Sequence, residues 1–274
     1  MTKVNTLLIG PVGSGKTTSL MTSVAAGYHT FVIATEPGID HILIHGDKCH
    51  WHYTPPAHVE WDILEKNANS LNTLEKGILE KMPGLNRTAY RQFINVLQTC
   101  ANFKCDVCGQ RFGPIDHLPA DAHVALDGMS GLAVMAMDLV AGGKPIKSLP
   151  DWGAAMDNLE RFVTKLCADT KCNFTMMAHI DREFDEITGG TKVMVSTLGR
   201  KLAPRIPRFF DEVVYCRKVG GRFFWSTIEG NTDLKARCLP FSDEIPPDFG
   251  ELFAAAGLYE VEMTNANLAG PETP

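Results

Sequence analysis

The sequence predicts an α/β fold in which a mainly parallel sheet is flanked by helices. Apolar, β-prone runs alternate along the chain with stretches of helical periodicity, and this alternation is typical of parallel strands joined by helices. Residues 7–18, "LLIGPVGSGKTT", match the phosphate-binding pattern G-x-x-x-x-G-K-[ST] at every fixed position. The chain has 274 residues, 45% of them hydrophobic, which suffices for one large core. We therefore expect one α/β domain with a nucleotide site.

The phosphate-binding motif lies between a predicted strand, residues 4–9, and a helix that follows Lys16. Glycines in this position let backbone N–H groups turn toward phosphate oxygens at a helix N-terminus. We expect Lys16 to reach the β- and γ-phosphates of ATP and Thr17 to ligate Mg²⁺. The predicted nucleotide-binding residues are Gly10, Pro11, Val12, Gly13, Ser14, Gly15, Lys16, Thr17 and Thr18.

Further elements follow from hydrophobic periodicity. Three short apolar runs predict buried strands, and the spacing i, i+3, i+4, i+7 predicts amphipathic helices. Two β-rich runs around Gly220-Gly221 predict a hairpin. The predicted strands are 30–35, 123–127 and 173–178, the predicted helices are 132–140 and 151–169, with others between 63 and 97, and the hairpin is 211–228.

Polar residues end each of the predicted core strands. Asp127 is placed to hold a Mg²⁺-bound water, unless it is only a turn aspartate. Glu36 is placed to deprotonate the attacking water, with an ordinary loop glutamate as the alternative. His179 is placed to contact the γ-phosphate, although a histidine at a strand end is as often a turn residue. Ligand sites of α/β sheets lie at this edge of the strands.

The stretch 45–118 has little periodic pattern at its start, and we interpret it as an insertion that carries a candidate zinc knuckle, residues 100–117. Cys105 and Cys108 have the C-x-x-C spacing of such a knuckle, and Cys100 and His117 could complete a tetrahedron. The rival ligands are Cys49, His50 and His52. Buried reduced cysteines without metal are the alternative. If zinc binds here, its expected role is structural.

Lys235 and Arg237 lie at alternate positions of a late β-prone run, "LKAR". Charged residues of this kind commonly protect a solvated edge strand. In an oligomer, the same pair could instead reach the γ-phosphate bound to a neighbouring subunit.

The order of the motifs resembles a known family. The segments on which this resemblance rests are "GPVGSGKTT", "FVIATEPG", "HVALDGMSGL", "FTMMAHIDREFDEITGG", "STLGRKLAPRIPRFFDEVVY" and "DLKARCLP". The chain resembles phage-encoded RecA-like P-loop ATPases, the group that includes ATP-dependent single-strand annealing recombination proteins. The resemblance implies a RecA-like core with Lys16, Thr17, Glu36, Asp127 and His179 in the roles given above. It also implies that Lys235 and Arg237 act in trans, as in hexameric RecA-like motors.

Between Thr191 and Arg208 the chain has basic residues and no acidic one. Gly199, Pro204 and Pro207 interrupt helical periodicity there, so we predict a mobile loop. The resemblance places this loop on the DNA path, and the expected DNA-binding residues are Lys192, Arg200, Lys201, Arg205 and Arg208. A solvated basic loop, or a contact for an acidic partner, is the alternative.

We expect residues 1–268 to form a single ATPase domain and residues 269–274 to form a flexible tail. The sequence contains no signal peptide and no apolar span near 18 residues, which predicts a cytoplasmic protein without a membrane partner, in the host cytoplasm if it is phage-encoded. The net charge of −6 excludes a uniformly basic nucleic-acid binder, so any DNA contact must be local.

Three classes of function fit these features. The favoured one is an oligomeric ATPase, a ring or a filament, that acts on single-stranded DNA in recombination, annealing or replication with phage or host proteins. The second is a small-molecule P-loop kinase. The third is a motor or regulatory ATPase in DNA packaging, whose zinc module would bind a protein partner. Stimulation of ATP turnover by single-stranded DNA or by a nucleoside would distinguish the first two.

Overall fold

The computed structural model describes residues 3–38, 47–83, 89–185 and 189–257, and within them the strands of the main sheet follow the order β11-β10-β1-β7-β6-β2-β3. All neighbours from β3 to β10 are parallel, and only β11 runs antiparallel to β10. The predicted mainly parallel sheet is confirmed. Its strands are β1 (Asn5–Ile9), β2 (His29–Ala34), β3 (Cys49–Tyr53), β6 (Ala122–Asp127), β7 (Asn173–Ala178), β10 (Glu212–Val219) and β11 (Arg222–Ser226).

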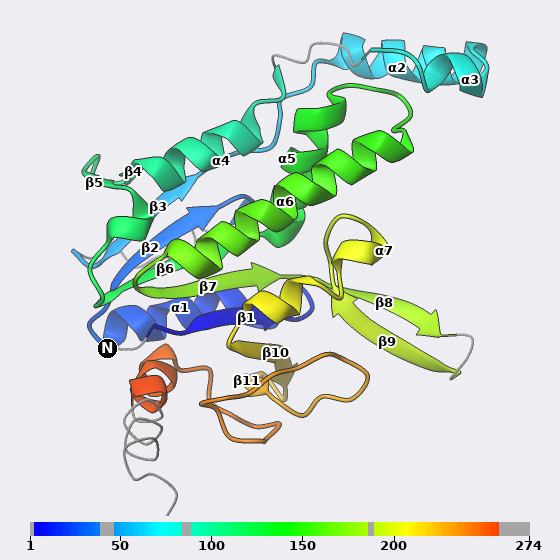
Figure 1. Cartoon of the computed structure of the whole chain (residues 1–274). Helices are drawn as coiled ribbons and strands as arrows, with labels where there is room; N and C mark the ends of the chain where they lie inside the picture. The colour runs from blue at the N-terminus through cyan, green and yellow to red at the C-terminus, as the bar shows by residue number, and fades with distance from the viewer. Residues whose placement is uncertain (1–2, 39–46, 84–88, 186–188, 258–274) are drawn as a thin grey trace, which may run out of the picture.

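Helices cover both faces of this sheet (Figure 1). On one face lie α4 (Gln92–Ala101), α5 (Met129–Ala141) and α6 (Leu149–Asp169), and on the other lies α1 (Lys16–Ala25). Successive residues of a strand point to opposite faces, so Leu7 and Ile9 pack with the α4–α6 layer while Leu8 packs with Leu20 of α1 and with Phe249. The result is a three-layer core with the sheet in the middle.

The long helix α6 begins with a capping box. The carboxylate of Asp151 accepts hydrogen bonds from the backbone N–H and the hydroxyl of Ser148, both at 2.8 Å. This arrangement satisfies N–H groups that a helix start leaves without partners. Its buried residues, among them Leu159, Phe162 and Val163, follow the predicted spacing, and the predicted helix 151–169 is confirmed.

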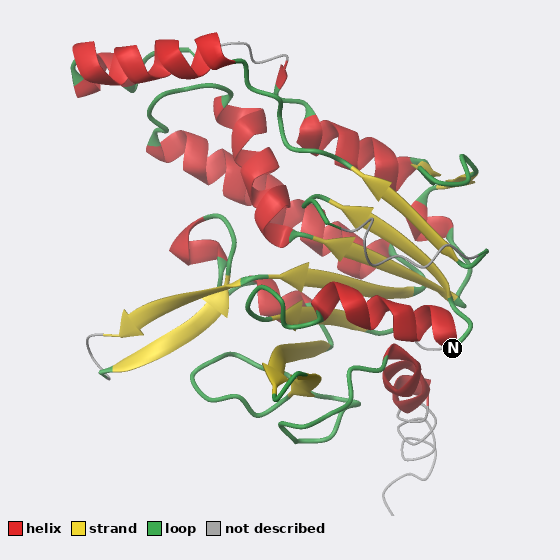
Figure 2. Ribbon diagram, turned by 180° about the vertical axis from the view of Figure 1, so that it is seen from behind, coloured by secondary structure: helices red, strands yellow, loops and turns green. Residues whose placement is uncertain are grey.

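Residues 45–118 are more closely joined to the core than a separate insertion would be. β3, inside this stretch, pairs with β2 as the edge strand of the main sheet. α4 packs on α5, and Phe93, Val96 and Phe103 are buried in the main core. Of the described elements in this stretch, α2 (Trp61–Thr73) and α3 (Lys76–Leu79) extend away from the body, as Figure 2 shows. The remaining elements are β4 (Phe103–Lys104), β5 (Arg111–Gly113) and the 3-10 helix η3 (Ile115–His117).

The prediction of a mobile loop at residues 191–208 is wrong. β9 (Gly190–Val195) forms a hairpin with β8 (Ile180–Asp185), and α7 (Gly199–Leu202) and the 3-10 helix η4 (Ile206–Phe209) follow. The hairpin projects from the sheet in Figures 1 and 2. Leu202 and Ile206 are buried in the main core, so the end of this segment is packed rather than free. The predicted tail, residues 269–274, lies outside the described residues.

Candidate nucleotide site

The phosphate-binding loop connects β1 to α1 at the carboxyl edge of the parallel strands. Gly13 and Gly15 have φ angles of 74° and 87°, which glycine adopts without strain. A Cβ atom at Gly15 would lie 2.7 Å from the ring of Phe223, and one at Gly10 would lie 2.5 Å from the carbonyl oxygen of Cys216. The β10–β11 hairpin therefore packs directly against the loop, and only glycine fits at these two contacts.

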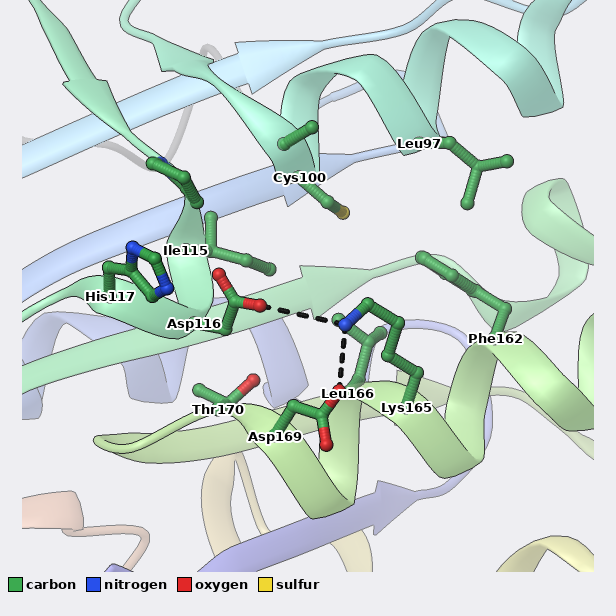
Figure 3. Close-up of a pocket in the computed structure, with 12 residues that line it drawn as sticks. Leu97, Cys100, Ile115, Asp116, His117, Phe162, Lys165, Leu166, Asp169 and Thr170 are labelled. Carbon is green, nitrogen blue, oxygen red and sulfur yellow. Dashed lines mark hydrogen bonds and ion pairs between the residues drawn. The ribbon is translucent and has the colours of Figure 1, made fainter.

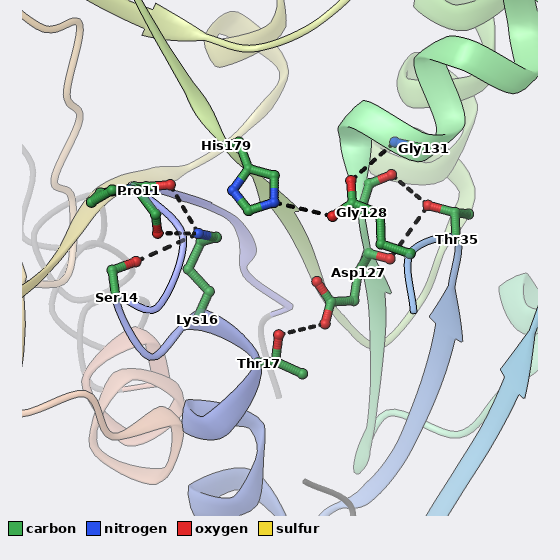
Figure 4. Close-up of polar contacts among 11 residues, drawn as sticks. Pro11, Ser14, Lys16, Thr17, Thr35, Asp127, Gly128, Gly131 and His179 are labelled. Atoms are coloured by element: carbon green, nitrogen blue, oxygen red, sulfur yellow. Dashed lines mark hydrogen bonds and ion pairs between the residues drawn. The ribbon is translucent and has the colours of Figure 1, made fainter. Parts of the chain in front are cut away.

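Lys16 points back into the loop (Figure 4). Its Nζ donates hydrogen bonds to the carbonyl oxygens of Gly10 and Pro11, both at 2.9 Å, and lies 3.4 Å from Oγ of Ser14. Burial lowers the pKa of Lys16, although the nearby thiol of Cys216 and the carboxylates of Asp127 and Glu36 oppose this shift. A cation held this close to the loop backbone is positioned for phosphate oxygens.

Thr17 and Asp127 bring two oxygen groups together. Oγ1 of Thr17, in the first turn of α1, donates to Oδ2 of Asp127, at the end of β6, over 2.6 Å. Burial raises the pKa of Asp127, while the hydrogen bond from Thr17 lowers it. Hydroxyl and carboxylate oxygens are the ligands that Mg²⁺ prefers, and Mg²⁺ commonly keeps several waters. The pair fits Mg²⁺ in the type of its oxygen donors, and Thr17 and Asp127 are the residues that would hold the ion.

Glu36 is held between a helix N-terminus and a histidine. Its Oε1 accepts a hydrogen bond from the backbone N–H of Gly131, in the first turn of α5, at 3.0 Å. Its Oε2 lies 3.0 Å from Nε2 of His179, which follows β7. Nδ1 of His179 is buried and has no hydrogen-bond partner among the described residues, so its hydrogen-bonding capacity is not satisfied by that part of the protein.

These residues surround one pocket of about 260 Å³. The pocket is lined by the loop from Val12 to Thr18 together with Glu36, Asp127 and His179, and by Pro37 and Gly38. Gly10 and Pro11 do not line it, but they hold Lys16 through their carbonyl oxygens. The structure thus brings together the loop of the phosphate-binding motif, the Thr17–Asp127 pair and the Glu36–His179 pair from strands far apart in the sequence.

The family comparison agrees with this geometry. A family described as AAA domain matches residues 2–238. The chain belongs to the AAA domain family. This assignment supports a nucleotide-binding ATPase that uses Mg²⁺. No curated protein matches the chain. Among the described parts of the chain, no helix has both the length and the apolar character that are needed to cross a membrane.

Lys235 and Arg237 lie away from the nucleotide pocket of their own AAA domain. Lys235 forms an isolated bridge with Val213 of β10, and its Nζ donates to the carbonyl oxygen of Phe210 at 2.6 Å. Arg237 forms an ion pair with Asp211 at 2.7 Å. Asp211 precedes β10, and the start of β10 pairs with the start of β1. The pair therefore lies toward the end of the strands opposite to the phosphate loop.

The basic residues between 191 and 208 are exposed, and carboxylates hold several of them. Lys192 pairs with Asp233 at 3.3 Å, Arg200 with Glu183 at 2.8 Å and Arg205 with Glu160 at 3.1 Å. Lys201 and Arg208 form no ion pair within the described ranges. Carboxylates from other segments therefore offset part of the local positive charge that the sequence alone suggests.

The structure separates the four predicted zinc ligands into two places. Cys105 and Cys108 lie with His50, one of the rival ligands, and their ligand atoms are all within 4.8 Å of one another. Cys100 and His117 instead line a mostly apolar pocket against α6 (Figure 3). His52 is held by Asp106 over 2.8 Å. The zinc ligand set that geometry favours therefore contains His50 in place of Cys100 and His117.

Sequence reasoning did not identify Gly131 and Phe223 as parts of the nucleotide site. Gly131 provides the N–H group for Glu36, and Phe223 packs on Gly15. The only trace of the first in the sequence is the glycine in "DGMSGL", and the structure shows why it is glycine, because a Cβ at Gly131 would lie 2.5 Å from the carbonyl oxygen of Thr35. No local signal identifies Phe223.

Proposed function

We propose that this AAA-domain protein hydrolyses ATP and couples the hydrolysis to single-stranded DNA, in recombination, annealing or replication. The main support for ATP hydrolysis is one pocket, in which Lys16, the Thr17–Asp127 pair and the Glu36–His179 pair meet. In this proposal, Lys16 and Mg²⁺ neutralise phosphate charge and Glu36 activates water. The resemblance to RecA-like phage ATPases supports DNA as the partner.

The connection from His179 to the β8–β9 hairpin supports a link between nucleotide and DNA. His179 directly precedes β8, and its carbonyl oxygen accepts a hydrogen bond from the N–H of Ser196, directly after β9, at 2.8 Å. Both ends of the hairpin are therefore fixed at the residue that faces the nucleotide pocket. A shift of His179 on γ-phosphate binding would move the hairpin and the basic residues beyond it.

We expect the double variant Arg200→Ala with Lys201→Ala to bind single-stranded DNA more weakly and with less dependence on salt. Each lost phosphate contact should reduce the slope of log affinity against log salt by about 0.7. DNA-stimulated ATP turnover should fall, while ATP binding without DNA stays unchanged. Fluorescence anisotropy with a labelled oligonucleotide at several salt concentrations measures the effect.

Lys66→Ala with Lys76→Ala is the matched control for this experiment. It removes the same charge from the projecting α2–α3 segment, where both lysines are exposed and ion-paired. If both double variants lose the same affinity, only net charge matters, and the DNA surface proposed here does not exist. Stimulation of turnover by a nucleoside, and not by DNA, would favour a small-molecule kinase instead.

We further propose that Lys235 and Arg237 act on the nucleotide of a neighbouring subunit. Their distance from their own phosphate loop is compatible with such a role, but Arg237 would have to leave Asp211. An Arg237→Ala protein mixed with a Lys16→Ala protein should regain ATPase activity, because a shared interface then contains one intact loop and one intact Arg237. Co-assembly of the two variants, measured by light scattering, without any gain in activity would contradict the proposal.

A further inference from the structure

The turn between β4 and β5 has the geometry of a metal-binding knuckle. The N–H of Gly109 donates to the carbonyl oxygen of Cys105 at 3.0 Å, and Gly109 has a φ of 72°. In this closed turn the sulfur atoms of Cys105 and Cys108 lie within 4.8 Å of each other. Glycine at this position adopts the left-handed conformation without strain.

His50 brings a third donor from another part of the chain. It lies in β3, its Nδ1 is 3.8 Å from Sγ of Cys108, and its ring packs on Phe31 and Phe112. Zn–S and Zn–N bonds of about 2.3 and 2.0–2.1 Å at tetrahedral angles place a nitrogen and a sulfur roughly 3.6 Å apart. The observed distance is therefore close to that of two ligands on one zinc ion.

The structure assigns a zinc site to His50, Cys105 and Cys108, which joins the β4–β5 turn to the edge strand of the main sheet. Imidazole and thiolate, the two types of donor in this set, are those that zinc prefers. Cys108 is exposed, so water can reach the fourth position of a tetrahedral ion. The site differs from the nucleotide site in its residues and needs no nucleotide.

The position of the turn explains what zinc would stabilise. Asp106, between the two cysteines, donates its N–H to the carbonyl oxygen of Trp51 at 2.8 Å, and its carboxylate accepts the N–H of Tyr53 at 2.8 Å. The turn thus covers part of the free edge of β3, and edge strands need such protection against pairing with other chains. A zinc ion on His50 would fix the turn in this place.

The test measures metal content in the full-length protein purified without chelator from zinc-supplemented medium. We expect about one zinc per chain, and a Co²⁺-substituted protein with the absorption of thiolate ligands. His50→Ala, and Cys105→Ser with Cys108→Ser, should lose the metal, while His50→Cys should retain it because it supplies another thiolate.

The double variant Cys100→Ser with His117→Ala is the matched control. It removes the other two ligands that the sequence suggests, and it should keep its zinc. Nucleotide affinity of each variant shows whether the core has folded. Metal-free wild-type protein that binds neither Zn²⁺ nor Co²⁺ would overturn the proposal, and so would full zinc content in a folded His50→Ala variant.

Discussion

Lys16→Ala is expected to abolish ATP turnover and to weaken ATP binding by about 10² to 10⁴-fold. Two hydrogen bonds from a charged group to phosphate contribute roughly 1.5–3 kcal/mol each, and alanine removes both. Lys16 is also only 7% exposed, so a cation from solvent cannot easily take the place of its ammonium group. Titration with a fluorescent ATP analogue measures binding, and phosphate release measures turnover.

Lys16→Arg is a useful companion variant. Arginine keeps the charge, but its planar guanidinium does not match the compact ammonium that bonds the carbonyl oxygens of Gly10 and Pro11. Turnover should therefore remain low although charge is retained. A melting temperature near that of wild type would show that the loss is local. Normal ATP binding by a folded Lys16→Ala protein would contradict the role given to the loop.

The strands and helices of the core could be predicted because their apolar residues follow the pattern of a buried strand or an amphipathic helix. Strands β2, β6 and β7 are short apolar runs that are buried along almost their whole length, as expected for a parallel sheet with both faces covered. Helix α6 carries a regular apolar stripe. In each case the residues near in sequence were enough to define the element.

The prediction was less successful where tertiary contacts decide the structure. β3 has the sequence "CHWHY", which lacks an apolar run, and it becomes a strand because it pairs with β2. Likewise, the basic residues at 191–208 suggested a free loop, whereas Val193 and Val195 of β9 pair with Arg182 and Ile180 of β8. The strands of this hairpin are adjacent in the chain, but β8 has the sequence "IDREFD", whose few apolar residues give no hydrophobic pattern that would reveal it.

In the candidate nucleotide site, too, the parts built from nearby residues could be predicted and those built from distant residues could not. The phosphate loop could be read directly from its motif, since its function depends on backbone turns between near residues. The partners of Glu36, by contrast, are Gly131 and His179, which lie 95 and 143 positions along the chain. Only the order of the strands in the sheet brings these residues together.

Glu36→Gln is expected to reduce ATP turnover by about 10² to 10⁴-fold, the usual contribution of a general base, while ATP binding remains near wild type. Glutamine keeps an oxygen that can accept the N–H of Gly131, so α5 keeps its N-terminal contact. It cannot take a proton from water. Single-turnover measurements at saturating ATP separate this chemical effect from a change in affinity.

One further variant determines whether Glu36 acts as a base or only positions its neighbours. His179→Gln removes the imidazole but leaves the carboxylate of Glu36, so it should reduce turnover less than Glu36→Gln does if the carboxylate takes the proton. If Glu36 only positions His179, which lies 3.0 Å away, the two variants should lose similar activity. Unchanged turnover in Glu36→Gln would exclude the general-base role, because an amide cannot accept the proton from the attacking water.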